Sequence, residues 1–533
     1  MPIAHTRAYV AAALLSAAAT TATAQKSAAD DSVVLRRLRE ETSAHSQVLR
    51  TATILSDVFG PRLAGSPNYR AAAEWARGEL ASYGVASAHL EAWGTRRGRT
   101  WTPTRYSVEL FAPYYARLVA YPRAWSPATT GVVRGTPVLL TDVRADTDIA
   151  RYGDRLRGKI VLLGEPPALD TSHVAPMIQR WTTRELDSLA RLTDPGAPKD
   201  YWEDSGDEYL AHLRARQRVA LALGRAGVAV VLTPSLVADA PSVNGYQAYD
   251  SDLSGAAPAF VLSRGDYARV VNLVRLARDA RQPAPVLALD LATRSIIPRT
   301  RDDSIGYDVI AELPGDDPTL GQEVVMAGGH FDSWTAGTGA TDNAAGAAVV
   351  MEALRLLHAV GARPKRTIRI ALWDGEEQEE YQGSMGYVRH HFGDPVTMRL
   401  LPEQTRISAY FNIDHGAGRI RGIRLQGNAA ARPYLERVLA PLADLGATTV
   451  TIANRGETDH MPFVAVGIPA FTFLQDPLDY DTRTHHTNAD VAASLFPADL
   501  QQAALVTAAV LFQTANLPQL LPRLSAPKPH ATH

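Results

Sequence analysis

Six side chains in the second half of the sequence have the types and the order that a two-metal hydrolase requires. Two divalent ions that share a water need a bridging carboxylate, nitrogen and oxygen ligands on either side, and a base for the water. Asp342 is the candidate bridge, and the other candidate ligands are His330, Glu377, Asp414 and His486. Because these donors are imidazoles and carboxylates without a thiolate, the set favours zinc, with cobalt and manganese left open.

Glu376 directly precedes the candidate ligand Glu377, and both follow an apolar run that is typical of a strand. On a turn after a strand, neighbouring side chains point in different directions. We therefore expect Glu377 to bind a metal ion while Glu376 faces the bound water as its general base. The pair His485 and His486 leaves a choice, since the ring of either residue is a candidate for the second imidazole ligand.

Strands that alternate with helices are predicted to position these residues. This alternation favours an α/β fold with a mainly parallel sheet sandwiched by helices. Most of the candidate residues directly follow a predicted strand, so we expect them to gather at the carboxyl edge of the sheet. Asp342 is expected at the start of a helix, where the backbone dipole favours a carboxylate. The predicted strands are 323–327, 367–373, 407–413 and 469–474, and the predicted helices are 343–360, 433–445 and 498–514.

Several motifs together resemble the M28 family of co-catalytic zinc exopeptidases, and most closely its plasma glutamate carboxypeptidase (carboxypeptidase Q) branch. The resemblance extends along much of the chain. It rests on 60–67 (Gly-Pro-Arg-Leu-Ala-Gly-Ser-Pro), 328–377, 412–414 (Asn-Ile-Asp), 458–460 (Thr-Asp-His) and 485–490 (His-His-Thr-Asn-Ala-Asp).

The resemblance implies a role for each candidate residue. It pairs His330 with Asp414 on one zinc and Glu377 with His486 on the other, with Asp342 as the bridge and Glu376 as the base. Asp332 would orient the His330 ring and support catalysis. Spacing to Asp490 favours His486 as the ligand and leaves His485 to stabilise an oxyanion or contact substrate. The family also implies a cis peptide bond between Asp342 and Asn343, a supporting role for Asp459 and His460, and a homodimer.

A β-rich stretch from residue 129 to 294 resembles a protease-associated domain inserted into the peptidase. The predicted organisation is a signal peptide (1–24), a first catalytic part (25–128), the insert (129–294), a second catalytic part with the metal site (295–522) and a disordered tail (523–533). Within the insert, the helix-rich section 170–225 is interpreted as a lid, an oligomer contact or a surface elaboration.

The first residues predict export from the cytoplasm. His5 and Arg7 precede an apolar run from Tyr9 to Ala19, and 22–24 (Ala-Thr-Ala) is a typical cleavage site, so the mature protein is expected in the periplasm or outside the cell. No later apolar run approaches the length of a membrane span. The sequence of 533 residues is 21% charged with a net charge of −2, which does not suggest nucleic-acid binding.

Other chemistries find little support in the sequence. It lacks cysteine, a Gly-x-Ser-x-Gly elbow and a His-Glu-x-x-His helix, which argues against thiol, serine-elbow and thermolysin-type catalysis. We therefore predict a dizinc exopeptidase that cleaves short peptides or dipeptides with metal-activated water. Whether it acts as an aminopeptidase, a carboxypeptidase or a dipeptidase is open. The alternatives are a non-catalytic receptor-like binding ectodomain and a single-zinc glutaminyl cyclase.

Overall fold

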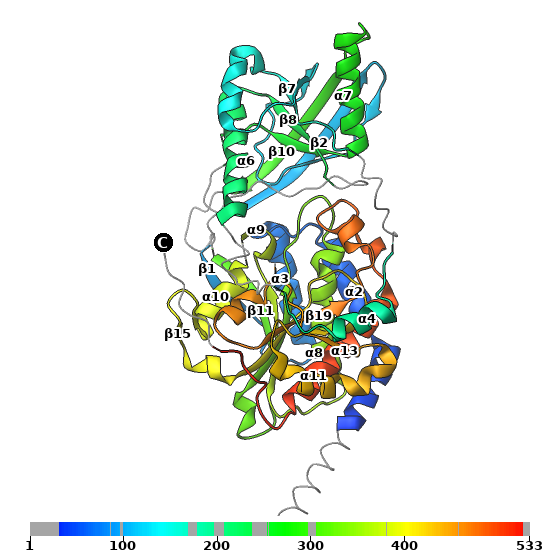
Figure 1. Cartoon of the computed structure of the whole chain (residues 1–533), viewed down its shortest axis with the longest axis vertical. Coiled ribbons are helices and arrows are strands. Elements are labelled where there is room, and N and C mark those ends of the chain that lie inside the picture. Colours follow the sequence, from blue (N-terminus) through cyan, green and yellow to red (C-terminus); the bar gives the residue numbers. More distant parts are fainter. Residues whose placement is uncertain are drawn as a thin grey trace, which may run out of the picture.

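The computed structural model describes residues 31–85, 87–95, 100–168, 178–196, 207–236, 253, 255–296, 305–379, 381–456 and 458–525. The chain forms a larger region (31–95 and 305–525) and a smaller region (100–296), most of which lies above it in Figure 1, except that α4 (Thr183–Ala190) lies beside the larger region. The predicted signal peptide and residues 526–533 of the predicted tail lie outside the described residues. Among the helices that the structure describes, none is long and apolar enough to cross a membrane.

The larger region is built on an eight-stranded sheet whose four central strands are parallel, as predicted. Each of these strands is almost entirely buried, which explains their near-continuous apolar sequences. In spatial order they are β13 (Thr367–Trp373), β12 (Val324–His330), β16 (Ile407–Asn412) and β19 (Ala470–Gln475).

The sheet as a whole is mixed: four of its seven strand pairings are parallel and three are antiparallel. Antiparallel pairs flank the centre on both sides, and only the outermost β18 returns to a parallel pairing, with β17. A short connection without a crossover helix joins β11 to β12, and another joins β16 to β17. Strands joined in this way can run in opposite directions, whereas parallel strands need a longer crossover. The flanking strands are β1 (His89–Thr95) and β11 (Ile305–Leu313) on one side and β17 (Ile420–Arg424) and β18 (Thr449–Thr451) on the other.

Helices cover both faces of this sheet. One face is covered by α8 (Ala345–Ala359) and α13 (Pro497–Ala515), which pack against each other and against the sheet. This face forms the main core, because most of the buried apolar side chains of the region lie in its cluster. Burying one of them, such as Leu354, contributes about 1.5–3 kcal/mol. The other face packs aromatic side chains against α10 (Gln382–His391) and α12 (Met461–Ala465). Helices α2 (Val48–Thr53) and α3 (Pro67–Ser82) complete the region, and Ser66 caps α3 as its sequence predicts.

The smaller region contains a four-stranded sheet (β3-β2-β10-β5) and a five-stranded sheet (β4-β9-β8-β7-β6), which share one apolar core. Its first long strand is β2 (Thr100–Ala112), which pairs along its length with β10 (Val286–Ile296). The strand β2 thus joins this sheet ahead of residue 129. The other strands are β3 (Ala116–Arg117), β4 (Ala120–Pro122), β5 (Val133–Gly135), β6 (Val138–Leu140), β7 (Ile160–Leu163), β8 (Val230–Pro234) and β9 (Ala259–Leu262), with helices α6 (Asp207–Arg225) and α7 (Arg264–Asp279).

A bridging segment, residues 178–196, connects the smaller region to the larger one and includes α4 (Thr183–Ala190). Gln179 forms a β-bridge with Leu478. Arg180 forms ion pairs with Asp476 and Asp499 at 3.0 and 2.7 Å. This part of the predicted helix-rich section 170–225 therefore packs against the larger region.

Candidate metal centre

The carboxyl edge of the eight-stranded sheet brings the predicted residues together. His330 is the last residue of β12, and Asp414 lies two residues beyond β16. Glu376 and Glu377 begin the short helix α9 (Glu376–Glu379), where the sequence suggested a turn. Parallel strands thus deliver a histidine and three carboxylates to one edge, as expected from their positions.

The inner side of the site consists of His330, Asp342 and Asp414. His330 Nε2 lies 3.1 Å from Asp342 Oδ1 and 2.9 Å from Asp414 Oδ1. The three side chains are 1%, 4% and 7% exposed, respectively. Burial lowers the pKa of His330, but the charges of Asp414 and Glu376 and the hydrogen bonds to Asp342 and Asp414 raise it well above its usual value.

The outer side of the site consists of Asp342, Glu377 and His486. His486 Nε2 lies 3.2 Å from Asp342 Oδ2 and 2.8 Å from Glu377 Oε2. Burial lowers the pKa of His486, yet the charge of Glu377 and its carboxylate contacts raise it to about 10. Burial and the like charge of Asp342 raise the pKa of Glu377 to about 8.

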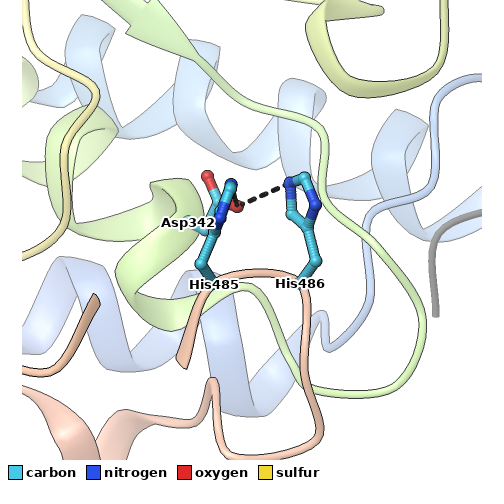
Figure 2. Close-up of side chains that lie close together, drawn as sticks. All are labelled: Asp342, His485 and His486. Atoms are coloured by element: carbon cyan, nitrogen blue, oxygen red, sulfur yellow. Dashed lines mark ion pairs between the residues drawn. The ribbon is translucent and has the colours of Figure 1, made fainter. Parts of the chain in front are cut away.

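Both neighbouring histidines approach Asp342, as Figure 2 shows. His485 Nε2 is 3.9 Å from Asp342 Oδ2, farther than His486, and the His485 side chain is 43% exposed. Burial and the positive charge of His486 lower the pKa of His485 to about 4. His485 is therefore a neutral ring at the open side of the site, and its two predicted roles stay predictions.

These residues fit a metal site. The donor atoms of His330, Asp342 and Asp414 lie within 4.8 Å of one another, and so do those of Asp342, His485 and His486. Glu377 Oε1 is buried without a hydrogen-bond partner in the described part of the chain. Buried carboxylates are costly unless they are paired or bind a metal ion, and imidazole with carboxylate is a zinc-type donor set.

A short irregular turn places Asp342. It lies in a turn over Ala340–Ala344 with non-helical backbone angles, and α8 begins at Ala345 rather than at the predicted residue 343. The predicted cis peptide bond between Asp342 and Asn343 is confirmed. A Cβ atom added to Gly346 would lie 2.3 Å from Asn343 Oδ1 and 2.7 Å from Ile413 O, so only glycine permits this packing beneath the site.

Asp332 contacts both His330 and the start of α9. His330 Nδ1 is 3.1 Å from the backbone oxygen of Asp332 and 3.8 Å from its carboxylate. The two carboxylate oxygens accept hydrogen bonds from the backbone N–H groups of Glu376 and Glu377, each at 3.2 Å. The side chain thus orients the pair of glutamates, while its backbone oxygen is the closer contact of the His330 ring.

Glu376 lies beside His330, and their ligand atoms lie within 4.8 Å of each other. Loss of solvent raises the pKa of Glu376 well above its usual value; His330 opposes this rise, and Asp414 and Glu377 add to it. A carboxylate with a raised pKa beside a reaction centre is suited to accept and return a proton.

Asp459 and His460 lie beneath the site in buried positions. Asp459 Oδ1 accepts a hydrogen bond from Ser384 Oγ at 2.6 Å. Burial lowers the pKa of His460 to about 3, so this ring is neutral. Asp459 acts on His330 and Asp414 through its charge, and within the described chain it is bonded to Ser384 rather than to a candidate ligand, so its supporting role stays a prediction.

Arg62, Trp334 and Tyr480 also position the site, although sequence reasoning gave them no role. The buried guanidinium of Arg62 donates to the backbone oxygens of Phe331 and Gly339, which flank the candidate ligands. In the sequence, Arg62 was marked only by its place in the motif at 60–67. Trp334 Nε1 donates to Glu377 Oε2 at 2.6 Å. Burial and then the charge of Asp342 raise the pKa of Tyr480, and its ring packs on the His485 ring with 4.7 Å between the ring centroids.

Comparisons with known proteins agree with this geometry. Residues 308–511 match Peptidase family M28. The chain is 26% identical to carboxypeptidase Q of Bos taurus over 483 residues, which cover 90% of this chain and 88% of the relative. The structure of a peptidase M28 precursor from Shewanella amazonensis is similar with a TM-score of 0.65 at 24% identity, covering 93% of this chain and 99% of that chain. A zinc aminopeptidase from Bacillus subtilis shares the fold with a TM-score of 0.52 at 17% identity, covering 87% and 93% of the two chains.

Proposed function

We propose that this chain is an exopeptidase that uses two zinc ions to hydrolyse short peptides, because residues 308–511 match Peptidase family M28 and the chain is similar over most of its length to a carboxypeptidase Q. The observation that carries the proposal is the position of Asp342. Its Oδ1 faces His330 and its Oδ2 faces His486, so each oxygen serves one side of the site. A carboxylate shared in this way is what a two-metal centre requires.

The proposed ligands are His330, Asp342 and Asp414 for one zinc ion and Asp342, Glu377 and His486 for the other. When bound, the two ions would activate a water and stabilise the negative charge of the transition state. Asp332 would hold the glutamates in place through the N–H groups of α9. Arg62 would hold the loops that carry His330 and Asp342.

Glu376 is proposed to carry the proton in the reaction. Its carboxylate would accept a proton from the attacking water and return it to the leaving amine. The raised pKa of Glu376 supports this role, because a base whose pKa lies nearer the working pH can both take up and release a proton. His485 is proposed to contact the substrate, since its neutral ring lies exposed at the open side.

Exopeptidase activity is proposed from the name of the bovine relative, which is a carboxypeptidase. We further propose that the smaller region, 100–296, is an inserted protease-associated domain, because its two sheets and core are separate from the eight-stranded sheet. Export through the N-terminal signal segment is proposed from sequence alone. A homodimer stays a prediction of the family resemblance.

The substitution Glu376→Gln tests the proposed function. The variant should retain its zinc, since Glu376 is not among the proposed ligands, but it should lose about 10²–10⁴-fold in kcat on dipeptides. Glu403→Gln is the matched control, because it removes an exposed carboxylate that binds His391. Near-normal turnover of the Glu376→Gln variant with full zinc content would remove Glu376 from this role.

A further inference from the structure

A positively charged cluster lies beside the candidate metal centre, and the mechanism above does not use it. It consists of Arg424, Arg455 and His415, which immediately follows Asp414. All three side chains are partly exposed. Among the described residues, neither arginine forms an ion pair with a carboxylate within 4.0 Å, although many other arginines of the larger region do.

Arg455 is held toward His415. Its Nε donates a hydrogen bond to His415 Nε2 at 2.7 Å. Because an arginine only donates, the His415 ring must accept at Nε2 and is neutral, with its proton on Nδ1. That Nδ1 is buried and has no hydrogen-bond partner in the described part of the chain. Among the described residues, the terminal nitrogens of Arg455 also have no hydrogen-bond partner, so their hydrogen-bonding capacity there is open to a ligand.

The cluster is joined to the candidate metal centre through His415. The His415 ring contacts Arg455 at 2.7 Å, and His415 directly follows the proposed ligand Asp414 in the chain. Burial and then Arg455 lower the pKa of Arg424 to about 10, while Asp481 acts in the opposite direction. Two neighbouring cations repel each other, and a bound anion would relieve this repulsion.

The loop that carries Arg455 is fixed by both regions of the chain. The Asn454 N–H donates to Pro195 O at 2.9 Å, and Asn454 Nδ2 donates to Gly196 O at 3.2 Å. The Arg455 N–H donates to Gln426 Oε1 at 2.8 Å. The bridging segment therefore positions the Arg455 loop, which gives part of the section 170–225 a specific function.

We propose that Arg455, with Arg424 beside it, binds the terminal carboxylate of a short peptide, so that the enzyme recognises the C-terminus of its substrate. This inference rests on the proposed function. In a dipeptide, one residue, or about 3.5 Å of chain, separates the scissile carbonyl from the terminal carboxylate. A guanidinium near the metal centre but outside it is therefore suited to bind the terminal carboxylate while the scissile carbonyl lies at the centre.

Two sources supply a carboxylate, namely the peptide terminus and an acidic side chain. The test therefore uses alanyl-leucine, alanyl-leucine amide and alanyl-glutamic acid α-amide as substrates. The wild-type enzyme should prefer alanyl-leucine over its amide by about 10²-fold in kcat/KM, since removing one partner of a desolvated charge pair costs that much. The glutamic acid α-amide should behave like the leucine amide.

Arg455→Gln should abolish this preference. We expect kcat/KM for alanyl-leucine to fall by about 10²-fold, while kcat/KM for the amide and the zinc content stay unchanged. Arg455→Lys should restore part of the preference, because it keeps the charge but not the planar fork. Arg437→Gln, which removes an exposed charge from α11 (Arg432–Leu439), is the matched control.

Three outcomes would overturn the inference. They are equal hydrolysis of the free acid and the amide by the wild type, an equal loss on both substrates in Arg455→Gln, and a preference for the acidic side chain over the free terminus. If the zinc-loaded wild type hydrolyses none of the peptides, the proposed function fails instead. Calorimetric binding of leucine against leucinamide to the wild type and to Arg455→Gln then decides the inference independently.

Discussion

The inner and outer sides of the metal centre share Asp342 but are built from different kinds of structure. On the inner side, His330 and Asp414 come from the ends of adjacent central strands and are almost fully buried. On the outer side, His486 comes from a loop, has a left-handed backbone conformation and is 19% exposed. Rigid strands therefore fix one half of the site, while a loop completes the other half where solvent reaches it.

This difference gives the two sides different tasks: the inner side holds its metal ligands rigidly, and the outer side faces solvent. Side chains on sheet strands are held by neighbouring strands, so the inner side needs few further contacts. The outer side instead depends on individual hydrogen bonds, such as that of Trp334 to Glu377. Asp490 also orders the Asp342 turn, since its carboxylate accepts from the Thr341 N–H and hydroxyl at 2.5 and 2.8 Å. We expect substrate to enter over the outer side.

Asp342→Asn should have the largest effect, because it weakens both sides at once. We expect loss of both zinc ions and a fall in kcat/KM of about 10³-fold or more, which corresponds to several kcal/mol of lost charge stabilisation. Zinc analysis and dipeptide kinetics measure this, with the thermal midpoint as a check on folding. Asp444→Asn, a surface carboxylate paired with Arg39, is the control. A variant that keeps both ions would contradict the shared role of Asp342.

His330→Ala and His486→Ala should separate the two sides. Each variant should lose about 10²-fold or more in affinity for one zinc ion and keep the other, since each removes a ligand from one side only. Metal titration followed by crystallography with anomalous scattering identifies which site remains. If both variants lose the same ion, the division into an inner and an outer side is wrong.

Zinc affinity should rise with pH, chiefly through the outer side. Against burial, which lowers it, the charge of Glu377, 2.8 Å away, raises the pKa of His486 to about 10, so this pair holds a proton at neutral pH. A metal ion binds the deprotonated forms and must displace this proton, so affinity increases by up to about tenfold per pH unit for each proton released. Calorimetry in buffers of different ionisation heat counts the protons. No proton release between pH 6 and 8 would contradict the described electrostatics.

Trp334→Phe should have the smallest effect and should be confined to the outer side. It removes the N–H that donates to Glu377 Oε2 but keeps an aromatic ring beside His486. Partners of a metal ligand typically contribute about 10–100-fold in affinity, and we expect the lower end here. Trp125→Phe, which changes the other ring of the edge-to-face pair with Trp334, is the control. Competition with a chelator measures the affinity of each ion.

Much of the fold and of the site was predictable from sequence, and the inner and outer sides show why. Apolar strands followed directly by His330, Glu376 and Asp414 indicate both a parallel sheet centre and its functional edge. The antiparallel flanks were not predicted, because a strand's sequence does not carry the direction of its partner. Neither was the place of β2 in a sheet of the smaller region, since β2 pairs with a strand far along the chain.

Contacts between segments distant in sequence were also out of reach. Arg62 lies about 270 residues before the backbone oxygens that it binds, and no local pattern links them. Likewise, Arg455 and His415 are far apart in sequence, and only the folded chain shows that they contact each other. Such residues lack periodicity or motif spacing, so only three-dimensional structure shows what they touch.

The zinc content of the purified mature protein, measured together with its dipeptide hydrolysis, tests the central claim most directly. We predict about two zinc ions per chain, loss of hydrolysis when a chelator removes them, and recovery of hydrolysis when zinc is restored. A protein that binds one zinc ion or none under saturating zinc, or that hydrolyses dipeptides equally well without metal, would contradict the two-metal centre.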